Sequence, residues 1–518
     1  MKLKLDTPKI KQMAPDAVAL EESMRLRQEW LFELTEPRTQ ADIMRLVKKH
    51  VQGVPCDLCK PYSGASSDTF RANFLGCTIL VRFPKCGSLA MFPEEAVRNE
   101  AAVLRYLQAN TGIPVPFVNY HGTAEEGLPF LRSPFLILDY MIHTGSLADT
   151  LRLATESLGR GKGHEEELGN KTADPKVGSD TLEAVYGEMA NVLLHLSRAA
   201  FEAIGALDQV NGNDDNEEEE TWEVRYRPLT MQMNQLTHVG SLPRARLPGP
   251  ETTFATSTDY FSHLADLHLA HLRSQRNSAI DCAADCRRKF VARRLFQRLA
   301  SADRLADPAL RYGPFPLWCD ELAPRHALTN GDGRVAAIID WKHTYAAPAE
   351  FAHAPPWWLL LTEPEDWAGG FEAWEDAYAP RLELFLRVLR EREDAAFADG
   401  WLPGEGEEPR LSDRMSASWE TGGFWLAYAA RKSFAFDWIY WHKLDQRFFG
   451  PLPPGVGPED AWRERLHMLD EADFAEMDEL VLAKLEEMKT CELKWEPEEV
   501  WPLNIEQTVE VASNGDTS

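Results

Sequence analysis

The chain has 518 residues, and its 44% hydrophobic fraction, with 16 Trp and 24 Phe, is enough to fill a large core. Its 82 acidic residues outnumber 55 basic ones, which gives a net charge of −27. This balance argues against nucleic acids and anionic membranes as partners, because phosphate binding needs clustered Lys and Arg. A cationic small molecule would instead be attracted to such a surface.

The N-terminal residues contain no apolar run of signal-peptide length, and no segment approaches the roughly 18 apolar residues of a membrane span. We therefore expect a cytoplasmic protein with eight reduced cysteines. A zinc site built from Cys56-x-x-Cys59 and Cys282-x3-Cys286 is disfavoured, since the two spacings differ and the second pair lies in a basic helical stretch.

The first 142 residues divide into an extension and a mixed region. Residues 1–50 form the predicted N-terminal helical extension, and residues 51–142 the following lobe. In this lobe, residues 78–83 and 133–142 are predicted strands. Between them, Pro93 and two acidic residues open a helix whose apolar positions recur at helical spacing: Val97, Ala101, Leu104 and Leu107.

Residues 143–500 are predicted to form a larger helical lobe with polar insertions near 154–181 and 208–221, followed by a disordered tail at 501–518. A helix is expected over 182–201. The run Gly159-x-Gly161-x-Gly163 lies in the first insertion. It follows no strand and opens no apolar helix, so it is not expected to bind phosphate.

The most informative stretch is LWCDELAPRHALTNGDGRVAAIIDW, residues 317–341. Residues 329–334 read as a hairpin turn before an apolar strand that ends in Asp340. A carboxylate at the end of a buried strand is costly without a partner, and a metal ion is a usual one. The acidic loop 319–326 precedes the hairpin, so two acidic positions flank it, as a magnesium–nucleotide site requires.

These residues resemble the aminoglycoside phosphotransferase and choline kinase-like family, and its fungal-type branch in particular, with a degenerate catalytic motif. Further segments match that family in the same order over residues 50 to 445: VRFP (81–84), VRNEAAVLRYL (97–107), TGIPVP (111–116), FLILDYM (135–141), IGAL (204–207) and APAEFAHAPPWWLLL (347–361). The resemblance implies an α+β, protein kinase-like two-lobe fold with a small N-terminal β-lobe and a large helical C-terminal lobe. It also implies ATP and Mg²⁺ between the lobes and a small-molecule hydroxyl acceptor.

Carried over by position, the resemblance implies a role for each matching residue. Arg82 takes the place of the nucleotide lysine, with Glu100 as its ion-pair partner, and Glu321 takes the place of the catalytic base. His326 and Asp340 fall at the metal positions. The remaining nucleotide-binding positions are the phosphate-covering loop and the adenine-binding hinge: Gly64, Ser66 and Ser67, then Asp139, Tyr140 and Met141.

Four positions depart from the family pattern. Glu321 is one methylene longer than the usual Asp, and a one-residue slip of the loop would present Asp320 instead. His326 replaces an oxygen ligand, although Mg²⁺ prefers oxygen. Arg82 replaces Lys, and Lys342 puts a positive charge beside the metal position where an acid is usual.

Two hypotheses follow. In the first, the chain is an ATP-dependent phosphotransferase in which Glu321 orients or deprotonates the acceptor hydroxyl. In the second, it is a catalytically inactive pseudokinase that keeps the fold as a nucleotide-binding or protein-interaction module, with protein partners. The altered residues around the catalytic loop motivate the second hypothesis.

Overall fold

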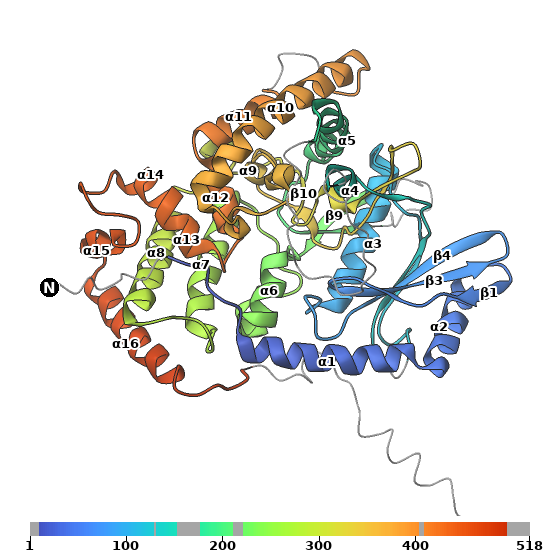
Figure 1. Ribbon diagram of the computed structural model, residues 1–518, viewed down its shortest axis with the longest axis horizontal. Helices are drawn as coiled ribbons and strands as arrows, with labels where there is room; N and C mark the ends of the chain where they lie inside the picture. Colours follow the sequence, from blue (N-terminus) through green and yellow to red (C-terminus); the bar gives the residue numbers. More distant parts are fainter. Residues whose placement is uncertain (1–9, 129–130, 153–176, 211–220, 403–408, 495–518) are drawn as a thin grey trace, which may run out of the picture.

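The computed structural model describes residues 10–128, 131–152, 177–210, 221–402 and 409–494. Figure 1 shows a sheet-rich N-terminal part on one side and a larger, mostly helical C-terminal part on the other. The expected α+β two-lobe architecture is therefore confirmed. The predicted C-terminal tail and most of both polar insertions lie outside the described residues.

The N-terminal lobe is built on an antiparallel sheet with the strand order β1-β3-β4-β6-β5, in which β2 also pairs with β3. Buried and less buried residues alternate along β3 and β4, because one face of these strands packs into the core. The strands are β1 (Pro55–Leu58), β2 (Tyr62–Ser63), β3 (Ser67–Phe74), β4 (Cys77–Pro84), β5 (Val118–Gly122) and β6 (Phe135–Asp139).

Helix α3 (Pro93–Asn110) packs between this sheet and the C-terminal lobe. It begins at Pro93 with two glutamates in its first turn, where they complement the helix dipole. The apolar stripe predicted from the sequence is buried. Asn99 and Glu100 are also buried, and this second, polar face supplies contacts to the C-terminal lobe.

The C-terminal lobe combines helices with three small sheets. In the first sheet, β11 (Ala327–Thr329) pairs with β7 (Gly145–Ser146) on one side and β12 (Val335–Ile338) on the other. In the other two, β8 (Ala206–Val210) pairs with β9 (Thr221–Tyr226), and β10 (Leu317–Cys319) with β13 (Thr344–Ala346). The main helices are α4 (Leu147–Arg152), α5 (Ser179–Arg198), α6 (Met231–Val239), α7 (Ser257–Ser274), α8 (Ala283–Ser301), α10 (Gly370–Ala398), α11 (Leu411–Glu420), α12 (Gly423–Ala430), α13 (Phe436–Ile439) and α16 (Glu471–Glu487).

Residues of the N-terminal extension connect the two lobes. Helix α1 (Ala17–Thr35) runs beneath α6 and the sheet and leads into α2 (Pro37–His50) (Figure 1). At its start, the buried carboxylate of Asp16 accepts hydrogen bonds from Ser241 (2.8 Å) and Asn277 (2.9 Å) of the C-terminal lobe. Towards its end, Trp30 Nε1 donates to Asp68 of β3 (2.8 Å). The helix is thus anchored to both lobes and restrains their relative position.

All eight cysteines are free thiols, three of them buried. Within the residues that the structure describes, no group of three or more His, Cys, Asp or Glu side chains is arranged to hold a metal ion. None of the helices in the described ranges is both long and apolar enough to cross a membrane.

Candidate functional site at the lobe interface

Arg82 and Glu100 form an ion pair between the sheet and helix α3. Their side chains are only 14% and 6% exposed. Burial alone would lower the pKa of Arg82, but the charges of Glu100 and Asp340 raise it, so the guanidinium stays charged. Glu100 also accepts a hydrogen bond from the backbone N of Trp341 (3.2 Å). One buried carboxylate therefore connects the N-terminal lobe to the segment that carries Asp340.

Asp340 lies beyond the strand that precedes it. The sequence predicts a strand that ends in Asp340, but β12 ends at Ile338 and Asp340 has a φ of +71°. This left-handed conformation breaks the strand, and Asp tolerates it better than most residues do. Backbone contacts hold the turn on both sides, since Ile339 N donates to His326 O (3.0 Å) and Asn99 Nδ2 donates to Lys342 O (2.7 Å).

Lys342 lies between the two acidic residues that flank the hairpin. Its ammonium Nζ is 2.5 Å from Asp340 Oδ1 and 3.0 Å from Glu321 Oε2. Burial would raise the pKa of Asp340, but the Lys342 charge lowers it to about 2. Burial likewise would lower the pKa of Lys342, but the charges of Asp340 and Glu321 raise it. All three groups are therefore charged at neutral pH.

Glu321, the predicted base, has a second partner in His343. His343 Nδ1 donates to Glu321 Oε2 (2.7 Å), which is the same oxygen that contacts Lys342. Burial would raise the pKa of Glu321, but the Lys342 charge and the His343 hydrogen bond lower it well below its usual range. A carboxylate held in this way is a weak proton acceptor, although it can still accept a hydrogen bond.

His326, the other predicted metal-side residue, lies near the carboxylate oxygen of Asp340 that Lys342 does not contact. Its Nε2 is 3.6 Å from Asp340 Oδ2 and accepts a hydrogen bond from Arg325 Nε (3.1 Å). Burial is the main cause of a lowered pKa, which favours the neutral imidazole. The buried Nδ1 has no hydrogen-bond partner in the part of the chain that the structure describes.

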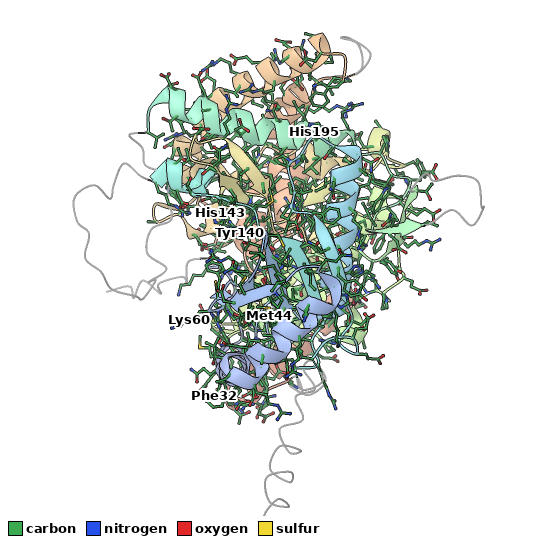
Figure 2. The ribbon with its side chains drawn as sticks, turned by 90° about the vertical axis from the view of Figure 1, so that its right-hand side faces the viewer. Phe32, Met44, Lys60, Tyr140, His143 and His195 are labelled. Carbon is green, nitrogen blue, oxygen red and sulfur yellow. The ribbon has the colours of Figure 1, made fainter. Side chains whose placement is uncertain are left out.

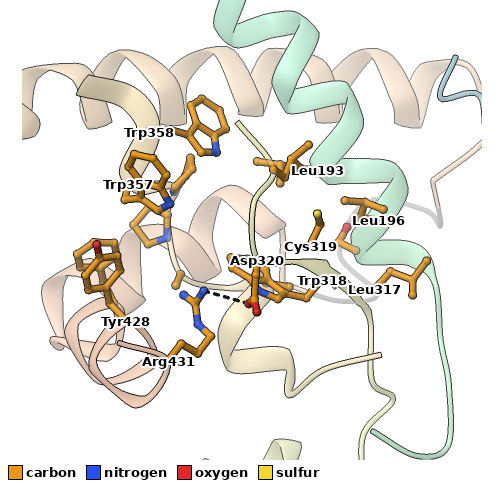
Figure 3. A pocket seen from close by; sticks show the side chains of 17 residues that line it. Leu193, Leu196, Leu317, Trp318, Cys319, Asp320, Trp357, Trp358, Tyr428 and Arg431 are labelled. Carbon is orange, nitrogen blue, oxygen red and sulfur yellow. Dashed lines mark hydrogen bonds and ion pairs between the residues drawn. The ribbon is translucent and has the colours of Figure 1, made fainter. Parts of the chain in front are cut away.

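Asp320, the predicted alternative to Glu321, points away from this cluster. Its carboxylate accepts hydrogen bonds from Met231 N at the start of α6 (3.0 Å) and from Trp318 Nε1 (2.9 Å), and it lies 3.6 Å from Arg431 Nη1. Figure 3 shows it facing Arg431 in a separate aromatic pocket. That cavity measures about 30 Å³, which is room for one water molecule. In this structure Asp320 stabilises the loop, and Glu321 faces the interface.

The predicted phosphate-covering loop forms the tight connection between β2 and β3. Gly64 N donates to Ser67 O (2.9 Å), and Ser66 is buried beside it. Lys85, which follows β4, is fully buried and donates from Nζ to Gly64 O (2.8 Å) and to Ser63 Oγ. The sequence did not single out Lys85, whose position beneath the loop depends on the pairing of β3 with β4.

The predicted hinge begins at Asp139, the last residue of β6. Asp139 accepts a hydrogen bond from Asn119 Nδ2 (2.7 Å), and Tyr140 N donates to Thr78 O (3.1 Å). Met141 O accepts from His143 Nδ1 (2.9 Å). Tyr140 and His143 lie between Met44 of α2 below and His195 of α5 above (Figure 2). The segment leads from β6 of the N-terminal lobe to β7 of the C-terminal lobe, and its role in holding adenine stays a prediction.

The donor set does not fit a magnesium ion. Mg²⁺ requires near-octahedral coordination by oxygen. Here an ammonium group lies against the two carboxylates, and the remaining side chain is an imidazole.

The sequence indicated a positive charge beside this site, but it did not indicate that Lys342 contacts both Asp340 and Glu321. His343 and Asn99 were not predicted: His343 lies outside the matched segments, and Asn99, although within residues 97–107, was given no role from the sequence.

No family model and no curated protein matches the chain. Among solved structures, it is similar to a thermostable mutant of aminoglycoside phosphotransferase APH(4)-Ia in ternary complex with AMP-PNP and hygromycin B, with 14% identity and a TM-score of 0.37 over 77% of this chain and 97% of that chain. It is also similar to macrolide 2'-phosphotransferase type I, with 14% identity and a TM-score of 0.35 over 77% of this chain and 97% of that one.

Proposed function

We propose that this protein is a phosphotransferase of the aminoglycoside phosphotransferase and choline kinase-like type, which binds ATP between its lobes and transfers a phosphoryl group to a hydroxyl of a small molecule. One observation carries the proposal. The buried Arg82–Glu100 pair is joined by Trp341 N to the segment that carries Asp340. Residues from β4, α3 and the hairpin segment thereby meet at one interface, in the family order of their motifs.

The side chains at this interface match the demands of phosphoryl transfer. That reaction needs positioning and charge stabilisation more than covalent chemistry. Arg82 supplies a planar cation suited to phosphate oxygens, with Glu100 fixing its orientation. The loop of Gly64, Ser66 and Ser67 would cover the phosphates, and Asp139 to Met141 would hold adenine through backbone groups. Glu321 would accept a hydrogen bond from the acceptor hydroxyl and orient it.

The acceptor is best sought among cationic alcohols. The net charge of −27 favours a positively charged acceptor over an anionic one. ATP is itself anionic and would be held by the specific contacts described above. A surface of this charge also disfavours nucleic acid and anionic membrane as alternative partners.

A second function is favoured by the state of Glu321. Its Oε2 is engaged by both Lys342 and His343, and its pKa lies well below the usual range. These contacts impede proton acceptance from a substrate hydroxyl. In this second proposal the chain binds nucleotide without transferring phosphate and acts on protein partners as a pseudokinase.

Calorimetric titration of ATP followed by an acceptor screen separates these proposals. Binding of ATP, with ADP formed only when a cationic alcohol is present, supports the phosphotransferase. Binding without turnover for any acceptor supports the pseudokinase, and absence of binding contradicts both. The double variant Glu321→Asp/His326→Asn adds a second criterion. A large gain in turnover means that the native residues impair catalysis, and a loss means that they are adapted to it.

A further inference from the structure

The position of Lys342 is fixed by the fold, and the side chain is not a mobile surface lysine. The residue is 7% exposed, and its backbone carbonyl accepts a hydrogen bond from Asn99 of α3. The residue before it, Trp341, is buried and donates its backbone N–H to Glu100. With the left-handed turn at Asp340, these contacts direct the Lys342 side chain back towards the acidic residues.

The charges of the cluster are already paired within the protein. Glu100 pairs with Arg82, whereas Asp340 and Glu321 share the single ammonium of Lys342. His343 and His326 complete the surroundings of the two carboxylates. A divalent ion bridging these carboxylates would compete with the ammonium for the same oxygens, and the two like charges would repel each other at this distance.

We propose that Lys342 is a built-in cation that replaces a divalent metal ion at this lobe interface. The ammonium offsets one of the two negative charges of Asp340 and Glu321, and it is the fixed positive charge offered to an anionic ligand. This inference rests on the proposed function only for the identity of that ligand, a nucleoside triphosphate. Its specific consequence is that ATP binding to this protein does not require a divalent ion.

The first test uses Mn²⁺ alone, so that it does not depend on nucleotide binding. Calorimetry and the electron paramagnetic resonance of free Mn²⁺ measure its affinity for the wild type, Lys342→Gln and Lys342→Ala. Lys443→Gln serves as the matched control, since Lys443 pairs with the single carboxylate of Glu375 (2.6 Å). The variants are first compared with the wild type by thermal unfolding, and Gln is included because it still donates a hydrogen bond.

We expect no saturable Mn²⁺ binding to the wild type or to Lys443→Gln. The Lys342 variants should gain one site, at least about tenfold tighter than any wild-type binding, that disappears when Asp340→Asn is added. Folded Lys342 variants that gain no site would overturn the proposal. So would wild-type binding of Mn²⁺ that Asp340→Asn abolishes, a result that needs no Lys342 variant to fold.

The second test compares the affinity of the wild type for ATP in excess Mg²⁺ and in EDTA. We expect the two dissociation constants to agree within about twofold, whereas Lys342→Gln should bind ATP more tightly with Mg²⁺. A wild type that requires Mg²⁺ for ATP would contradict the built-in cation. Failure to bind ATP under both conditions would instead contradict the proposed function and leave the Mn²⁺ result to decide the inference.

Discussion

The ammonium of Lys342 lies 2.5 Å from Oδ1 of Asp340, two residues before it in the chain. The same ammonium contacts Glu321, which lies on the other side of the hairpin, so one side chain joins both acidic positions. Since all three groups are largely removed from water, their mutual attraction is screened little by salt. The site is therefore a partly neutralised cluster that contributes to stability before any ligand is bound.

The pKa of Asp340 predicts a specific loss of stability in acid. Its value of about 2 is below the ordinary 3.8, so its stabilising contribution is complete above pH 4 and is lost as the pH falls towards 2. The shift corresponds to roughly 2 kcal/mol, of which about half is lost by pH 3. Urea unfolding at pH 6 and pH 3 should show a larger fall in the free energy of unfolding for the wild type than for Asp340→Asn. An equal fall in both proteins would contradict the depressed pKa.

Arg82→Ala should weaken both folding and nucleotide binding. It leaves the Glu100 carboxylate buried without its cation, which costs on the order of 3 kcal/mol of unfolding free energy. It also removes the cation assigned to phosphate, so the dissociation constant for ATP should rise by about tenfold or more. Chemical denaturation and calorimetry measure the two effects separately.

The matched control is Arg227→Ala. Arg227 pairs with Glu95 of the same helix α3 through two hydrogen bonds, 2.9 and 2.6 Å long, and its side chain is similarly buried. This variant should lose comparable stability but keep its affinity for ATP within about twofold. If both variants lose affinity alike, the effect of Arg82 on binding is a consequence of destabilisation and not of a phosphate contact.

The sequence predicted the parts of this site that depend on local pattern. The helix that carries Glu100 follows from apolar spacing, and the strand that carries Arg82 follows from its run of apolar residues. It could not predict which charges meet across the interface. The contact of Lys342 with Glu321 requires the left-handed turn at Asp340, which no residue in the segment demands. Asn99 likewise reads as a solvent-facing helix residue until the C-terminal lobe is placed against it.

The N-terminal extension should contribute to stability through Asp16. Its carboxylate caps α1 by accepting from Val18 N (3.0 Å) and also accepts from Ser241 and Asn277 of the other lobe. Asp16→Ala should therefore cost roughly 3 kcal/mol of unfolding free energy, which is more than the ~1 kcal/mol of a cap alone. Asp470→Ala is the control, because that residue caps α16 while 64% exposed. Equal losses would show that the contacts of Asp16 with the second lobe add nothing.

A second titration, in the C-terminal lobe, should act in the opposite direction to that of Asp340. Burial and the charge of Glu363 raise the pKa of Glu365 from 4.5 to about 7, although Lys432 and Tyr428 oppose the shift. A carboxyl group whose pKa is raised on folding stabilises the protein below its unfolded pKa, and this contribution is lost as the pH rises through 7. The wild type should thus lose roughly 2 kcal/mol between pH 5 and pH 8 that Glu365→Gln retains. Glu372→Gln, at an exposed position of α10, should behave like the wild type. If Glu365→Gln loses as much stability as the wild type over this range, Glu365 does not titrate near pH 7.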